Sequence, residues 1–194
     1  MHETFAALHS GTRDSLIDLA FRWAEGELSA TTFAEEMDAL LLDAHTQAVV
    51  IGRTHAGDGA PEDEDDRRFA AGVVTDEHAY LQGFVDQMQS GAFTDEAGVR
   101  DAERVAARAS LYAGRLTGSA NQAWTLTLDE ETLIYWVLGG AEDHCDECPE
   151  LAERSPYLPV ELKRYPGSNQ TPCKMNCLCS LQAESGQRGF AIPG

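Results

Sequence analysis

Two segments near the C-terminus, DHCDEC at residues 143–148 and PCKMNCLCSL at residues 172–181, hold all five cysteines of this 194-residue chain. A Cys-x-x-Cys pair such as Cys145–Cys148 can present two sulfur atoms to one metal ion, and zinc prefers four ligands in a tetrahedron. The second segment offers one thiol more than four-coordination needs. The sequence therefore predicts a structural zinc site formed by Cys145, Cys148, Cys173 and Cys177, with Cys179 as the alternate ligand.

The choice among these ligands stays open at the level of sequence. Cys177 and Cys179 are two residues apart, so on a strand both would face the same side and either could reach one site. His144 could also replace one thiolate. A different interpretation is that the cysteines are reduced thiols that pack a small β element without any metal.

The same segments argue against catalysis, because four thiolates close a zinc site to substrate. A redox pair is not expected, since the Cys-x-x-Cys does not open a helix in a β-α-β pattern and the flanking acidic residues disfavour the thiolate. The chain also lacks a nucleophile elbow, a P-loop, a His-Glu-x-x-His motif and the His-x-Glu of zinc deaminases. We expect a protein that is not an enzyme.

The charge balance restricts the partners of the chain. Fourteen basic residues stand against 33 acidic ones, which gives a formal net charge of −19. Such a surface repels phosphate backbones, so direct nucleic-acid binding is not expected. No apolar run approaches the roughly 20 residues that span a bilayer, and the N-terminus lacks the features of a secretory signal. We therefore expect no membrane association and a reducing cytoplasm, which suits thiols or a thiolate-bound metal.

The first part of the chain has helical periodicity. Phe33, Met37, Leu41 and Ala48 recur at steps of three and four, and Ser29 or Thr32 can cap that helix, with Thr32 and Glu35 in a capping box. Further apolar patterns indicate helices over residues 16–25, 69–88 and from Thr94 or Asp95 to Leu116. The fold class expected is mainly α: a bundle or arm of about four helices, followed by a small β element that carries the cysteine-rich module.

Three polar features interrupt or decorate these helices. Residues 52–66, with three glycines, a proline and an acidic run, are interpreted as a solvated loop, and their spacing does not fit a calcium site. His45 lies among apolar residues and is expected to be structural. Arg100, Arg104 and Arg108 form a row that either contacts an anion or partner, or pairs with nearby acidic residues.

The pattern then changes to β. Threonines and leucines alternate in WTLTL at residues 124–128, and IYWVL at residues 134–138 and CLCSLQ at residues 177–182 are expected to be antiparallel strands. We therefore divide the chain into a helical region at residues 1–122 with an acidic loop at 52–66, a small β and zinc-type module at 123–182, and a tail at 183–194. The tail is expected to be ordered only when a partner holds it.

The last third resembles the minor head, or head-morphogenesis, proteins of tailed bacteriophages (Mu F-like). That family typically has a tryptophan-containing strand, an acidic-His-Cys-x-x-Cys knuckle, a proline-rich span with a Pro-Gly turn, and an Asn-Cys-Arg-Cys segment. The corresponding parts here are residues 135–138 (YWVL), 143–148 (DHCDEC), 165–167 (YPG) and 176–179 (NCLC). Leu178 replaces the usual arginine, and Cys173 stands where many members have His-Pro.

The resemblance implies a structural protein of the phage head that acts in capsid and portal assembly. Its partners would be the portal protein, the major capsid protein or both, and its location the virion, with the host cytoplasm as the place of assembly. The alternative is a cytosolic, zinc-stabilised protein-interaction module unrelated to virions.

Overall fold

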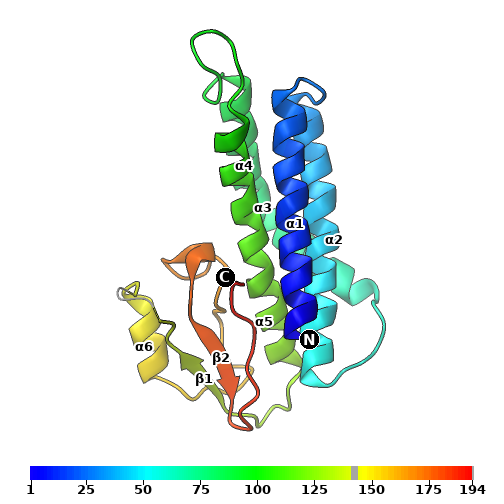
Figure 1. Ribbon diagram of the computed structural model, residues 1–194. Coiled ribbons are helices and arrows are strands. Elements are labelled where there is room, and N and C mark those ends of the chain that lie inside the picture. Colours follow the sequence, from blue (N-terminus) through cyan, green and yellow to red (C-terminus); the bar gives the residue numbers. More distant parts are fainter. Residues whose placement is uncertain (141–143, 194) are drawn as a thin grey trace.

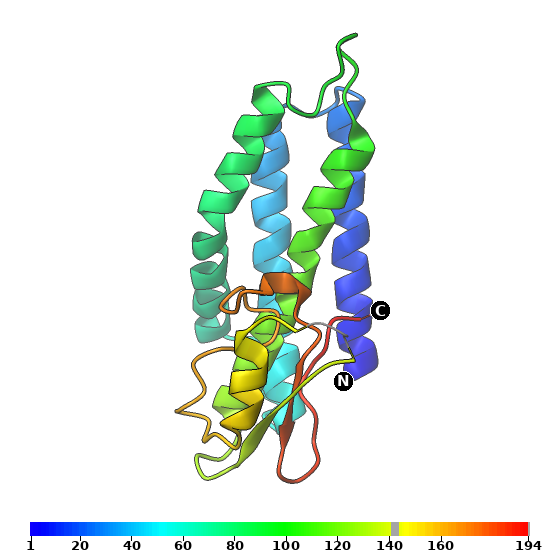
Figure 2. The ribbon, with the colours of Figure 1, turned by 90° about the vertical axis from the view of Figure 1, so that its left-hand side faces the viewer.

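The computed structural model describes residues 1–140 and 144–193, apart from the side chain of Met175, and shows a four-column helical bundle with a small module at its side (Figures 1 and 2). The first three columns are the single helices α1 (His2–Ala24), α2 (Ala30–Ala56) and α3 (Glu64–Gln89). The fourth runs without a break through α4 (Ala102–Ser110), the 3-10 turn η1 (Leu111–Arg115) and α5 (Leu116–Thr127). The expected mainly helical class is confirmed.

Helix α1 is longer than the predicted helix over residues 16–25. It begins at His2, because Phe5, His9 and Thr12 extend the buried face that Leu16 and Leu19 continue. In α2 the predicted cap at Ser29 is confirmed: its hydroxyl accepts a hydrogen bond from the Thr32 N–H at 3.0 Å. The alternative capping box at Thr32 is wrong, since Thr32 already lies inside the first turn.

The predicted loop at residues 52–66 is shorter than expected. Helix α2 continues to Ala56 and ends at Gly57, whose φ of 110° suits a left-handed cap, and α3 begins at Glu64. Asp63 caps α3 in a reciprocal capping box with Asp66. The acidic run therefore starts a helix, where negative charge is favoured by the helix dipole.

The helix expected to start at Thr94 or Asp95 starts instead at Ala102, with Asp101 accepting the Arg104 N–H at 3.0 Å. Asp95 uses its carboxylate to accept two backbone N–H groups of the preceding loop, those of Ala97 and Val99. These local hydrogen bonds hold Asp95 in a loop, so this residue does not start a helix.

The arginine row of the fourth column covers aromatic rings. The guanidinium groups of Arg100, Arg104 and Arg108 lie 4.8, 5.4 and 4.6 Å from the ring centroids of Trp23, Phe93 and Phe84, respectively. Of the nearby acidic residues, Asp101 is 3.9 Å from Arg104. The three arginine side chains thus stack on aromatic rings at the edge of the core, and ion pairing contributes little to holding them there.

The small module contains the predicted antiparallel pair. Strand β1 (Ile134–Val137) pairs with β2 (Ser180–Ala183), with Trp136 opposite Leu181. A short helix, α6 (Glu147–Glu153), and a 3-10 turn, η2 (Lys174–Asn176), complete it. The β interpretation of WTLTL is wrong, because residues 124–127 end helix α5, so the boundary after residue 122 falls inside that helix.

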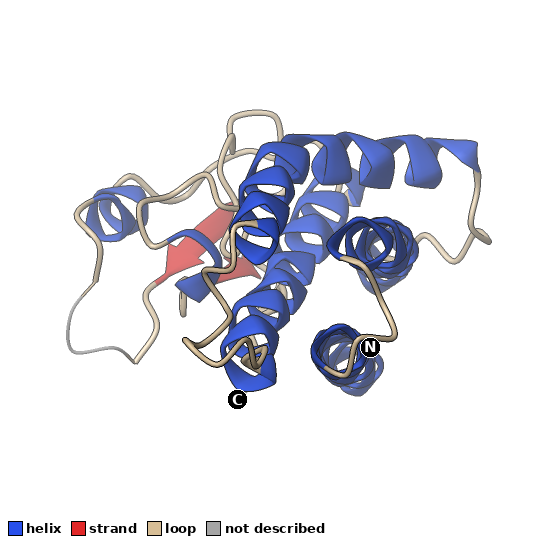
Figure 3. Cartoon of the chain, turned by 90° about the horizontal axis from the view of Figure 1, so that it is seen from above, coloured by secondary structure: helices blue, strands red, loops and turns tan. Residues whose placement is uncertain are grey.

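The module and the bundle share a hydrophobic core. Phe5 of α1 and Trp124 of α5 belong to the same buried cluster as Ile134, Trp136 and Phe190 of the C-terminal part. Seen from above, the module lies to one side of the bundle, beside the fourth column (Figure 3). A second cluster, made only of bundle residues, fills the other half of the helices.

The C-terminal tail is held by the chain itself, which corrects the expectation that a partner must order it. Phe190 is fully buried, its ring 4.9 Å from that of Phe5, and its N–H donates to Asn121 Oδ1 at 2.7 Å. None of the helices described is long and apolar enough to span a bilayer.

Candidate metal centre

Four short pieces of backbone bring the five cysteines together. Cys145 precedes α6 and Cys148 lies in its first turn, Cys173 and Cys177 flank η2, and Cys179 immediately precedes β2. The Cys-x-x-Cys thus leads into a helix, but this helix joins two antiparallel strands and is not part of a β-α-β unit. That helix has only seven residues, and it serves to point Cys148 inward.

The sulfur atoms are as close as ligands of one metal ion. Cys145 Sγ lies 3.2 Å from Cys148 Sγ and 3.4 Å from Cys173 Sγ, and Cys148 Sγ lies 3.6 Å from Cys173 Sγ and 3.8 Å from Cys177 Sγ. A tetrahedron with zinc–sulfur bonds of about 2.3 Å has sulfur atoms about 3.8 Å apart. The donor type and spacing therefore fit a metal ion, and the cluster can hold one.

The thiols form two overlapping groups with Cys148 in common. One contains Cys145, Cys148 and Cys173, and the other contains Cys148, Cys177 and Cys179; within each group the sulfur atoms lie within 4.8 Å of one another. Three of the predicted ligands, Cys145, Cys148 and Cys173, thus lie together, whereas the fourth, Cys177, is grouped with Cys148 and Cys179. Cys177 and Cys179 both lie close to Cys148, but neither belongs to the strand that was expected to align them, because β2 begins at Ser180. The set with Cys177 as fourth ligand stays a prediction.

The site is largely shielded from water. Cys148, Cys177 and Cys179 are each 1% exposed, whereas Cys145 and Cys173 are partly buried. Such burial suits a metal with a structural role, because a catalytic metal needs a position open to substrate.

The thiols differ in how readily they ionise. Burial raises the pKa of Cys148, and hydrogen bonding to Cys179 raises the pKa of Cys177. Hydrogen bonds, first from Cys177 and then from the Gly139 backbone, lower the pKa of Cys179 to about 5. At Cys145, burial opposes ionisation, but hydrogen bonding with Cys148 and Cys173 outweighs it and lowers the pKa. Cys145 and Cys179 are thus the two thiols whose pKa is shifted toward the thiolate, the form that binds metal.

Trp136 is a part of the site that the sequence analysis did not assign to it. Its indole nitrogen is buried without a hydrogen-bond partner in the described chain, and its ring belongs to the same buried cluster as Cys148, Cys177 and Cys179. Gly139 lets the two segments approach, because a Cβ there would lie 2.2 Å from the Leu178 carbonyl oxygen. In the sequence, the tryptophan within a β-type run and the glycine at its end were the features that could have assigned both residues to the site.

The Pro-Gly turn fastens the module to the bundle. Gly167 has a φ of 81°, and a Cβ there would lie 2.9 Å from Thr117 Cβ, while Ser168 packs directly on Gly118 of α5. Asn121, fully buried in α5, donates to the carbonyl groups of Pro166 at 3.4 Å and Phe190 at 2.9 Å. This asparagine bridges bundle, turn and tail, and no sequence pattern singles it out.

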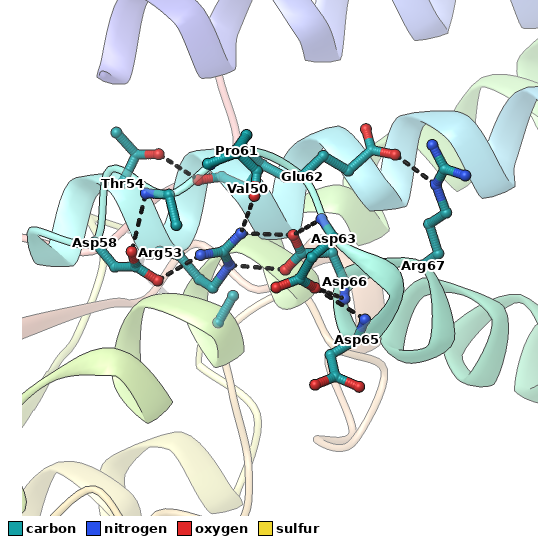
Figure 4. A network of polar contacts seen from close by, with 12 residues as sticks. Val50, Arg53, Thr54, Asp58, Pro61, Glu62, Asp63, Asp65, Asp66 and Arg67 are labelled. Atoms are coloured by element: carbon teal, nitrogen blue, oxygen red, sulfur yellow. Dashed lines mark hydrogen bonds and ion pairs between the residues drawn. The ribbon is translucent and has the colours of Figure 1, made fainter.

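One carboxylate of the acidic run, Asp66, is neutralised within the chain. Asp66 receives two hydrogen bonds from Arg53, at 2.7 Å from Nε and 2.6 Å from Nη2, and Arg53 also contacts Asp58 (Figure 4). These hydrogen bonds, Asp66 first, raise the pKa of Arg53, and the Ala60 N–H followed by Arg53 lowers that of Asp58. A bidentate pair of this kind joins α2 to α3.

A second polar cluster lies inside the bundle. His45 is fully buried, with Nδ1 2.7 Å from Ser119 Oγ and Nε2 3.4 Å from Glu77 Oε1, which in turn lies 2.7 Å from Arg115 Nε. The structural role expected for His45 thus has a physical basis, since Ser119 of α5 and Glu77 of α3 both contact its ring. Burial, followed by the charge of Glu77, raises the pKa of the adjacent Tyr112 to about 12.

Comparisons of the chain with protein-family models, with curated proteins and with solved structures found no match.

Proposed function

We propose that the protein is a structural minor head protein of a tailed bacteriophage, which acts in capsid and portal assembly and whose C-terminal module is held by zinc. One observation carries the proposal: the parts of the sequence resemblance meet in one place. Trp136 shares one buried cluster with the cysteines, and the Pro-Gly turn at Gly167 docks the same module on α5.

Zinc is the metal that this donor set suits best. Thiolates are soft ligands that select zinc over magnesium or calcium, and four of them form a closed tetrahedral site. Cys145, Cys148, Cys173 and Cys177 would hold the ion, with Cys179 as the alternate. Bound zinc would supply folding free energy to a module whose only sheet in the described chain has two strands.

The first experiment measures the metal. Protein purified without chelator should contain about one zinc per chain by mass spectrometry, and Cys148→Ser should abolish binding because Cys148 belongs to both sulfur groups. His144→Ala is the matched control and should keep the zinc. Near-zero zinc, with all five thiols freely titratable, would refute the zinc site.

The second experiment tests the role in the head. Purified heads and proheads from the phage that encodes the chain, analysed by mass spectrometry, should contain it, and the chain should co-purify with portal or major capsid protein. Recovery of the chain only from the host cytosol, with no binding to either protein, would refute the phage role. That result would favour the cytosolic interaction module instead.

A further inference from the structure

A small pocket lies where the metal-binding module meets the bundle. Its volume is about 140 Å³, and Tyr80, Arg108, Tyr112, Arg115, Asn169 and Lys174 line it. Tyr80 belongs to α3, Arg108 to α4 and Lys174 to η2, so three separate elements build its walls. Figure 2 shows η2 beside the fourth column of the bundle. A pocket of this size suits a single small group, since cofactor and drug sites are at least about twice as large.

The pocket gathers positive charge in a strongly acidic protein. Arg115 is neutralised by Glu77 at 2.7 Å. Arg108 instead donates to the neutral oxygen of Gln87 and stacks on Phe84. Within residues 1–140 and 144–193, neither Arg108 nor Lys174 has a carboxylate within 4.0 Å. Two uncompensated cations therefore face one cavity in a chain of net charge −19.

The module presents its two pocket residues in an unusual backbone conformation. Asn169 and Lys174 are the only non-glycine residues of the described chain with positive φ, at 65° and 52°. This conformation is disfavoured for a lysine, and such residues cluster at binding sites. The side-chain oxygen of Asn169 is also buried without a partner among the described residues. This oxygen is an acceptor, so Asn169 would contribute to carboxylate binding only with its amide turned to present the NH2 group.

Apolar side chains flank the charged part of the pocket. Tyr80 and Leu111, both in its lining, are 52% and 46% exposed, which leaves a ring and an aliphatic chain open beside the cations. A site with cations inside and apolar groups at its edge matches a carboxylate carried on an apolar stem better than a bare, fully hydrated anion.

We propose that this pocket binds a carboxylate group on an apolar stem, with Arg108 and Lys174 as its cationic ligands. The carboxylate belongs either to a free small acid or to the C-terminus of a partner polypeptide. Both sources offer the same chemistry, and the experiment separates them.

The experiment titrates the intact protein with benzoate and follows binding by calorimetry and by amide chemical shifts in NMR. Saturable binding is expected for benzoate and none for benzyl alcohol, which has the same ring without the charge. Lys174→Gln, at an exposed turn, should weaken benzoate binding about tenfold, and so should Arg108→Gln. Arg104→Gln, one turn earlier and outside the pocket, should leave it unchanged. Thermal unfolding of each variant separates lost binding from lost folding.

A second arm compares a short peptide that ends in a free phenylalanine carboxylate with the same peptide as its C-terminal amide. Tighter binding of the acid than of benzoate identifies a polypeptide terminus as the ligand, and equal or weaker binding identifies a free acid. No saturable binding of either carboxylate, equal binding of benzoate and benzyl alcohol, or an unchanged affinity in Lys174→Gln would overturn the proposal. None of these results depends on whether the chain is a phage protein.

Discussion

Replacing Gly52 with alanine tests the closest approach between two helices of the bundle. Gly52 lies inside α2 and faces α5, where an added Cβ would be 2.4 Å from the Ala120 carbonyl oxygen and 3.0 Å from the Trp124 nitrogen. Both are backbone atoms, so no side chain can rotate away. The two helices would have to separate by 0.6 Å to reach the shortest tolerated distance of 3.0 Å, and by 1.0 Å to reach ordinary contact at 3.4 Å.

Two effects of opposite sign determine how much Gly52→Ala changes the free energy of unfolding. Alanine favours the helix over glycine by about 1 kcal/mol. Overpacking a close contact costs about 1 to 3 kcal/mol, and the upper value applies here because backbone must move. We therefore expect Gly52→Ala to lower the free energy of unfolding by about 2 kcal/mol. For a chain of this size, that corresponds to a fall in Tm of about 4 to 8 °C.

Gly83→Ala is the matched control, since Gly83 lies inside α3 and an added Cβ would meet nothing within 4 Å. This substitution should raise the free energy of unfolding by about 0.4 to 1 kcal/mol. Urea denaturation followed by circular dichroism at the helix band measures both variants. If Gly52→Ala proves as stable as the wild type, or is stabilised like Gly83→Ala, the contact between α2 and α5 is looser than described and the reasoning fails.

Two further predictions concern buried titratable groups. Glu77→Gln leaves the charge of Arg115 buried and unpaired, so we expect the free energy of unfolding measured in urea to fall by about 3 to 5 kcal/mol. The control Asp76→Asn changes an exposed neighbour and should have little effect. Equal effects of the two substitutions would contradict the role of the pair. Burial, followed by the nearby Arg13, lowers the pKa of His9 below 6.5, so the unfolded chain takes up the proton first as pH falls, and stability should decline below pH 6.5. His9→Gln should reduce this decline between pH 7.5 and 5.5, and an unchanged pH dependence would exclude His9 as a contributor.

Local patterns predicted much of the fold. The spacing of Phe33, Met37 and Leu41 indicated the long second helix, Ser29 its first turn, and the β-branched run at residues 134–138 a strand. Predictions failed where a residue's local preference was overruled by a distant contact. Gly52 and the acidic run suggested a loop, but α5 needs a residue without Cβ at Gly52, and Arg53 binds Asp66 at the start of α3.

Local spacing was enough to show that five cysteines lie in two short segments and that they suit a metal with thiolate ligands. The folded chain was needed to show that Cys148 joins both sulfur groups, that Trp136 and Cys179 share one buried cluster, and that Lys174 and Arg108 line one pocket. The difference lies in how far apart along the chain the interacting residues are. Periodicity and spacing report the preferences of one segment, whereas the partner of a buried thiol or charge depends on which distant segments pack together.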